Sequence, residues 1–193
     1  DLPSIWRIFV IFFFCRYDIA GVRTFLGNRG YRGFVSYTEA VNESQAANVH
    51  DKCQAGCQKC QQNQVQATLV EKGYKKGKFS VITGACTNCA SRFTPQGLSP
   101  GAHLSDGLLD LILVSKTSRF NYLRYLYRSG YLRDSPFDLP FVQRLKVKEF
   151  TFVPDLKAKS SVWNCDGEVL DCTEINVKIH CKSLPVFARG PNK

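Results

Sequence analysis

Short apolar runs with strand-like spacing constrain the fold of this chain more than any other feature. The strongest run is LLDLILVS at residues 108–115, and FVSY at 34–37 and KFSVIT at 78–83 are shorter examples. Apolar and polar residues alternate again at residues 141–153 and in INVKIHC at 175–181. Several strands at short spacing with few long helices predict a mainly β domain, for which we expect a β-sandwich.

Two segments show helical spacing instead. Residues 18–28 (DIAGVRTFLGN) begin with an Asp that can cap a helix, and they contain an apolar stripe. Residues 119–128 (RFNYLRYLYR) repeat aromatic and leucine side chains every three or four positions. Between the strand-like runs, residues 38–77 are polar, rich in Gln and Cys and almost free of strand signal, which predicts an insertion at about those positions.

The start of the chain, residues 1–15, is atypical. Residues 5–14 (IWRIFVIFFF) are almost wholly apolar, but a helix that spans a bilayer needs roughly 20 residues. A buried element, or sequence foreign to the domain, accounts for this segment better than a signal peptide with a basic start and a small-residue cleavage site. Because the 193 residues begin at Asp1 and contain no Met, we expect a fragment of a longer protein.

The charge of the chain restricts its partners. Its 26 Lys and Arg residues exceed its 16 Asp and Glu residues, which gives a formal net charge of +10. Such an excess favours an anionic partner, and nucleic acid, nucleotide phosphate and an acidic membrane surface all meet that requirement. The apolar content of 44% is too high for an intrinsically disordered chain, so we expect a folded core.

Five of the cysteines are spaced as metal ligands often are. Cys53, Cys57 and Cys60 form C-x3-C-x2-C, and Cys86 and Cys89 form C-x2-C, so the two C-x2-C pairs resemble a four-thiolate zinc site. On a straight helix Cys53 and Cys60 would lie about 10.5 Å apart, too far to share one zinc ion, so the chain would have to turn between them. Free thiols in a reducing compartment are the alternative. A disulfide framework is less favoured, because nine cysteines is an odd number and no signal peptide is evident.

One segment combines positive charge with apolar side chains. Its basic residues are Lys116, Arg119, Arg124 and Arg128. A basic amphipathic helix is typical of membrane surfaces and calmodulin targets, although an ordinary helix packed on a sheet with a solvated basic face explains it too. Leu113, Phe120 and Leu126 have the 1-8-14 spacing of some calmodulin targets, but Leu113 falls within a predicted strand.

Residues 163–170 are strand-like on both sides of Asp166 and Gly167. An Asp-Gly pair in that position is typical of a two-residue hairpin turn, which is the simpler interpretation of the residues alone. Such a turn would project the carboxylates of Asp166 and Glu168.

Several motifs together resemble the C-terminal part of the ceramide kinases, in the wider diacylglycerol and sphingosine lipid kinase family. The matching segments are RYDIAGVRTFL from Arg16, the cluster CQAGCQKC, the stretch at residues 97–128, WNCDGEVL at 163–170 and VFARG at 186–190. The C-x3-C-x2-C triplet distinguishes ceramide kinases from their relatives. The resemblance covers residues 16–190, which it implies are one β-sandwich-type lipid kinase domain, leaving 191–193 as a tail.

The resemblance implies an intracellular enzyme, cytoplasmic and peripherally attached to membranes. It would use ATP and Mg²⁺ to phosphorylate the primary hydroxyl of membrane ceramide. The α/β nucleotide-binding domain of the family, with its GGDG segment and principal base, has no counterpart in these residues, and neither has the pleckstrin-homology domain. We therefore expect this fragment alone to be inactive.

The resemblance also assigns roles to individual residues. It implies that Asp166, Gly167 and Glu168 contact ATP, with Glu168 a secondary catalytic candidate, and that Arg16 contacts ATP phosphate. In bacterial relatives the aspartate that matches Asp106 helps to hold a structural magnesium ion.

Two other functions fit the same composition. A zinc-stabilised nucleic-acid-binding module would explain the charge and the cysteine pairs, but the basic residues are spread over the chain and no nucleic-acid fold signature is present. We therefore expect no nucleic-acid partner. The other function is that of a non-catalytic, membrane-binding remnant of a kinase.

Overall fold

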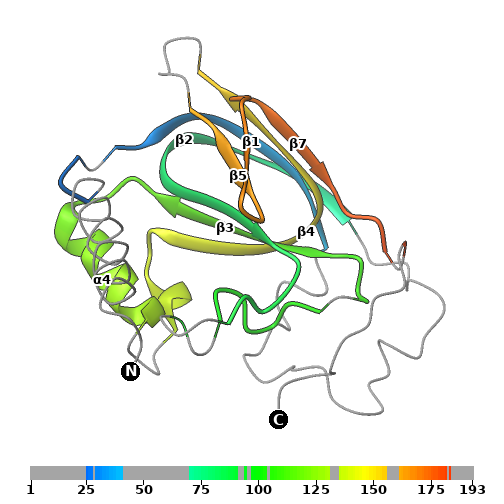
Figure 1. Cartoon of the computed structure of the whole chain (residues 1–193), viewed down its shortest axis with the longest axis horizontal. Helices are drawn as coiled ribbons and strands as arrows, with labels where there is room; N and C mark the ends of the chain where they lie inside the picture. Colours follow the sequence, from blue (N-terminus) through cyan, green and yellow to red (C-terminus); the bar gives the residue numbers. More distant parts are fainter. Residues whose placement is uncertain are drawn as a thin grey trace, which may run out of the picture.

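The computed structural model describes residues 25–27, 29–40, 70–90, 94, 97–103, 105–130, 135–155, 161–181 and 183 (Figure 1). Strands dominate this part of the chain, so the predicted mainly β class is confirmed. The elements are β1 (Tyr31–Ala40), β2 (Val70–Ala85), β3 (Leu109–Ser115), α4 (Arg119–Gly130), η1 (Pro136–Asp138), β4 (Val142–Pro154), β5 (Trp163–Cys165), β6 (Glu168–Leu170) and β7 (Ile175–Lys178).

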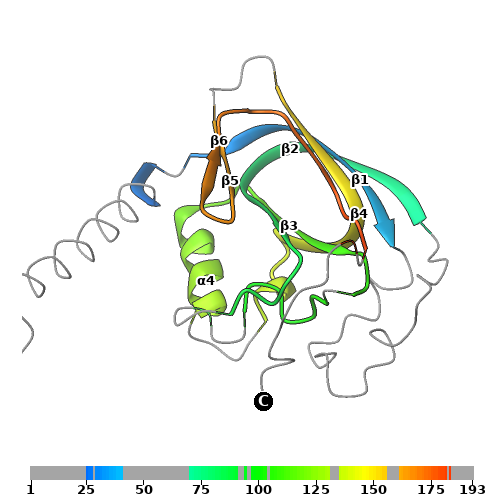
Figure 2. The ribbon, with the colours of Figure 1, turned by 45° about the vertical axis from the view of Figure 1, so that its right-hand side comes forward.

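Strands β1 to β4 form an antiparallel ring. β1 pairs with β2 on one edge and with β4 on the other, while β3 joins β2 to β4. The ring can close because β2 and β4 are long and bent: residues 70–79 of β2 pair with β1, and residues 79–85 pair with β3. Figure 2 shows this curvature, with the β5–β6 hairpin on the concave side. Closure pairs β1 with a strand on each side, as it does β3, so neither presents a free edge.

The sequence predicted a mainly β domain of sandwich type, and the structure adds that its strands close into a ring. The described strands form one five-stranded sheet, to which β7 adds beside β4, and a separate two-stranded hairpin of β5 and β6. Strand-length patterns do not distinguish these arrangements, since both need strands with one buried face.

β3 is buried on both of its faces. Leu109, Leu111 and Leu113 belong to the core cluster enclosed by the ring, where Phe79 and Phe150 also lie. The alternate residues of the strand, including Ile112 and Val114, lie in a second cluster with Tyr125 of α4 and Leu139. A strand covered on both sides has a nearly continuous apolar sequence, which explains why LLDLILVS gives the strongest strand signal.

Both ends of the predicted insertion are in fact strand. Residues 38–40 complete β1, and residues 70–77 begin β2, where Ala40 pairs with Val70. The expectation of almost no strand between residues 38 and 77 is therefore wrong at these ends. The lysine- and glycine-rich sequence of β2 gives little strand signal, and its pairing depends on packing, because the Tyr37 ring lies where a Cβ at Gly73 would be. Residues 41–69 lie outside the described part, so an insertion there stays a prediction.

The two predicted helices have different outcomes. The helix expected at 119–128 is confirmed as α4, whereas only residues 25–27 of the helix expected at 18–28 are described, and these are helical. In the part of the chain that is described, no helix has the length and apolarity needed to cross a membrane.

Candidate functional site

The turn at Asp166 and Gly167 joins β5 to β6. Both residues have positive φ angles, 50° and 101°, as the two central residues of a type I′ hairpin turn require. The Gly167 N–H donates a hydrogen bond of 3.0 Å to Asn164 Oδ1, and Cys165 pairs with Glu168. The hairpin turn predicted from the residues is therefore confirmed, and Asp166 and Glu168 are both exposed.

Trp163 attaches this hairpin to the ring. Its indole lies edge-on to Phe152, with ring centroids 5.7 Å apart, and 6.5 Å from the ring of Phe150. Its Nε1–H donates to the carbonyl of Thr173 at 3.1 Å, so the polar end of the indole is satisfied. The exposed turn is thus held at a defined position by aromatic packing at the base of its hairpin.

Lys146 of β4 is a buried cation between two aspartates. Its Nζ lies 3.4 Å from Asp106 Oδ2 and 3.6 Å from Asp110 Oδ1, and it donates to the Gly101 carbonyl at 3.1 Å. Lys146 is 4% exposed and Asp110 1%. Buried charges of this kind are tolerated only where they are paired. Because Gly101 and Asp106 belong to the loop before β3, Lys146 attaches that loop to the sheet.

The same loop contributes further polar contacts. The buried Ser99 hydroxyl donates to Asp110 Oδ2, and Asp106 Oδ1 accepts from the Leu108 N–H at 2.9 Å. His103 Nδ1 accepts from the Ser105 N–H at 3.1 Å, so its ring supports the loop from within. Burial raises the pKa of Asp106, and the Lys146 ammonium and the Leu108 N–H oppose that rise.

The hairpin turn and this loop both lie close enough to Cys86, directly after β2, for their carboxylates to affect its thiol. Burial raises the pKa of the Cys86 thiol, and the negative charges of Asp166 and Asp106 raise it further. In Figure 1 the tip of the hairpin lies over the region where β2 and β3 run side by side, in agreement with their pairing. The fold thus brings Asp106 and Asp166, which are far apart in sequence, close to the same thiol, that of Cys86.

The described carboxylates and thiols of this region are not arranged as a metal site. Within the described ranges, no group of three or more His, Cys, Asp or Glu side chains could hold a metal ion. One carboxylate oxygen of Asp106 accepts from the Leu108 N–H and the other faces the Lys146 ammonium, so its described partners are an N–H group and a cation. A magnesium-binding role for Asp106 therefore stays a prediction.

The remaining predicted site residues have simpler outcomes. Cys86 and Cys89 are exposed free thiols. Arg16 and the candidate zinc ligands Cys53, Cys57 and Cys60 lie outside the described residues, so their roles stay predictions.

α4 presents apolar and basic side chains to solvent. Phe120 is 84% exposed, and Leu123 and Tyr127 on the same face are also exposed, with Arg124 beside them. Leu113, by contrast, is fully buried in β3, so the 1-8-14 spacing noted in the sequence does not lie on one helix. Calmodulin binding stays a prediction, and it would have to use α4 itself.

Two residues that hold the loop before β3 to the sheet were not found in the sequence. Ser99 and Lys146 find their carboxylate partners only when the fold brings β3, β4 and the loop before β3 together. The available signal was Asp110, a carboxylate in an otherwise apolar strand run, which requires a buried partner.

Comparison with known proteins gives consistent matches. The family model for the ceramide kinase C-terminal domain matches residues 33–192. Human ceramide kinase is 37% identical over 91% of this chain and 40% of its own length. The mouse ceramide kinase is 36% identical over 91% of this chain and 41% of its own length, and that of Arabidopsis thaliana is 32% identical over 91% and 33%. The chain therefore spans less than half of the length of these relatives.

Proposed function

The chain belongs to the ceramide kinase family, and we propose that it is the C-terminal part of a lipid kinase that transfers the γ-phosphoryl group of ATP to the primary hydroxyl of ceramide. The product would be ceramide 1-phosphate. The observation that carries this proposal is the match of the family model to residues 33–192. Contact with ceramide would occur at a membrane, where the exposed apolar and basic side chains of α4 suit the interface.

The chemistry of the hairpin turn limits what its residues would do. Carboxylates accept hydrogen bonds and repel phosphate, so Asp166 and Glu168 suit the ribose hydroxyls or the adenine amino group better than the phosphates. Gly167 allows the tight turn that presents both side chains. Glu168 remains the secondary candidate for accepting the proton of the ceramide hydroxyl.

ATP supplies the phosphoryl group, and Mg²⁺ neutralises the phosphate charge in such transfers. Arg16 is the proposed phosphate contact of this chain, because a guanidinium pairs well with phosphate oxygens. The Lys146 cluster would keep the loop before β3 in place beside the turn, and Trp163 would keep the hairpin in place. In the complete protein we propose a cytoplasmic location with peripheral attachment to membranes.

The proposal is tested by ceramide phosphorylation with the complete reading frame and with residues 1–193 alone. We expect activity from the former and none from the latter, because the family's principal base lies in the N-terminal domain. Glu168→Gln and Asp166→Asn should lower the activity of the complete protein, whereas Asp171→Asn, an exposed change just beyond β6, should not. A folded, complete protein that binds vesicles but phosphorylates no ceramide would instead support the non-catalytic membrane-binding remnant.

A further inference from the structure

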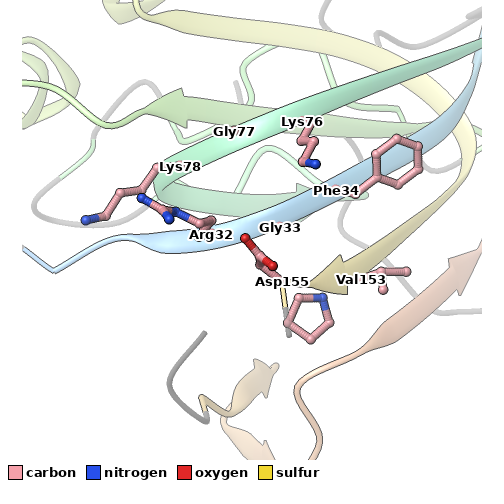
Figure 3. Close-up of a pocket in the computed structure, with 9 residues that line it drawn as sticks. Arg32, Gly33, Phe34, Lys76, Gly77, Lys78, Val153 and Asp155 are labelled. Atoms are coloured by element: carbon pink, nitrogen blue, oxygen red, sulfur yellow. The ribbon is translucent and has the colours of Figure 1, made fainter. Parts of the chain in front are cut away.

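A basic pocket lies on the outer face of β1, β2 and the end of β4 (Figure 3). Its volume is about 550 Å³. The charged and the larger apolar side chains of its lining are Arg32, Phe34, Lys76, Lys78, Val153 and Asp155. The hairpin turn at Asp166 is not part of this lining.

Two of the positive charges of the pocket lie directly opposite one another. Arg32 on β1 pairs in register with Lys78 on β2, and Lys76 lies two residues further along the same face, opposite Phe34. Like charges at directly opposed positions of an antiparallel pair destabilise a sheet. Among the described residues, Asp155 is the carboxylate that lines the pocket with these three basic side chains.

Neighbouring groups add to the positive potential. The Lys116 N–H donates to the Lys78 carbonyl at 2.8 Å, which brings a fourth basic residue beside the pocket. Burial lowers the pKa of Lys116, and the charges of Lys78 and Arg119 lower it further. Asp155 is the one carboxylate of the lining. An anion in the pocket would therefore relieve repulsion between at least three cations.

The rim next to these charges is aromatic. Phe34 and Tyr74 stack with ring centroids 5.8 Å apart, and Tyr74 is 75% exposed. Val153 extends the apolar rim on β4 and is itself exposed. Tyrosine and other aromatic side chains favour the boundary between lipid and water, because one part of the ring system is apolar and the other is polar.

We propose that the basic pocket binds the phosphate-bearing headgroup of an anionic membrane lipid, with Arg32, Lys76 and Lys78 on the phosphate and Phe34 and Tyr74 at the lipid–water boundary. A free phosphate would use the same cations but gain nothing from the aromatic rim. The inference goes beyond phosphoryl transfer, because it requires neither ATP nor the hairpin turn. It would orient the chain on the membrane in which ceramide lies.

The test is co-sedimentation of the full 193-residue chain with vesicles of phosphatidylcholine, with and without phosphatidic acid. We expect binding only when phosphatidic acid is present, and we expect Arg32→Glu to weaken it by roughly tenfold. Arg32→Glu should remain folded, because it replaces repulsion of Lys78 by attraction. Lys72→Glu, the same charge change on the exposed face of β2 but outside the pocket, should change binding by no more than about twofold.

A second pair of measurements separates lipid from free phosphate. Tyr74→Ala should weaken vesicle binding but leave binding of inorganic phosphate unchanged. The proposal is overturned if Lys72→Glu and Arg32→Glu weaken vesicle binding equally, because the attraction would then be diffuse. It is also overturned if Tyr74→Ala has no effect on vesicles, because the pocket would then be a site for soluble anions.

Discussion

Lys146 of β4 and Asp110 of β3 occupy directly paired positions of the sheet, and both are almost completely buried. Their charged atoms, Nζ and Oδ1, are 3.6 Å apart. Asp106 and Ser99 complete the pairing from the loop before β3. The loop that carries Ser99 and Asp106 is therefore fixed to the sheet by charge as well as by apolar packing.

Lys146→Met should strongly destabilise the chain. The substitution would leave Asp106 and Asp110 buried without their cation, and breaking a buried ion pair on one side costs about 3–5 kcal/mol. Urea unfolding followed by circular dichroism measures this loss. Lys148→Met on the same strand, where the side chain is only half-buried, is the matched control. Equal unfolding midpoints for the two variants would contradict the role given to Lys146.

The stability of the chain should depend on the protonation of Asp106. Burial is the largest cause that raises the pKa of this carboxyl in the folded chain. A group with a raised folded pKa contributes stability below its unfolded pKa, about 4, and loses that contribution as the pH rises through the folded pKa. The free energy of unfolding, relative to Asp106→Asn, should therefore fall as the pH increases from about 4 towards neutrality.

Urea titrations of the chain, of Asp106→Asn and of Asp171→Asn at several pH values measure this difference. Asp171 is exposed, so its variant should follow the unsubstituted chain at every pH. A difference between the chain and Asp106→Asn that does not change with pH would show that Asp106 has the same pKa in both states.

How far the sequence predicts this fold depends on where each element gets its stability. β3 and α4 could be predicted, because their own residues have the period of a strand or a helix. The first half of β2 could not, because its glycines and lysines are stabilised by partners such as Tyr37 on β1. Ring closure could not be predicted either, since it requires β1 to pair with two strands at once.

The candidate site also has one part that its own residues predict and other parts that depend on distant partners. The Asp166–Gly167 turn is local, and its residue types alone predict the type I′ conformation. The partnership of Asp110 with Lys146 depends on the register between β3 and β4, and no local pattern contains that information. The proximity of Asp166 to Cys86 likewise depends on where Trp163 packs.

Cys86 should report on the position of the hairpin. Its thiol has a raised pKa, first through burial and next through the charge of Asp166, so its reactive thiolate is scarce at neutral pH. We expect alkylation of Cys86 by iodoacetamide to be slower than that of Cys172, although both thiols are exposed, because the pKa of Cys86 is raised. Asp166→Asn removes a negative charge, lowers the pKa of Cys86 and should accelerate its alkylation. Peptide mass spectrometry over a pH series measures both rates, and an unchanged Cys86 rate would show that the charge of Asp166 does not act on the thiol.

Gly167→Ala should separate the function of the turn from the stability of the fold. No atom lies within 4 Å of the position a Cβ would take, so the only cost is that of a positive φ, roughly 1–2 kcal/mol. The complete protein should stay folded but lose ceramide phosphorylation, because the altered turn displaces Asp166 and Glu168. Gly73→Ala is the contrasting variant, since its Cβ would meet the Tyr37 ring and should destabilise the sheet itself. If Gly167→Ala retains full activity in a thermally stable protein, the conformation of this turn is not needed for phosphoryl transfer.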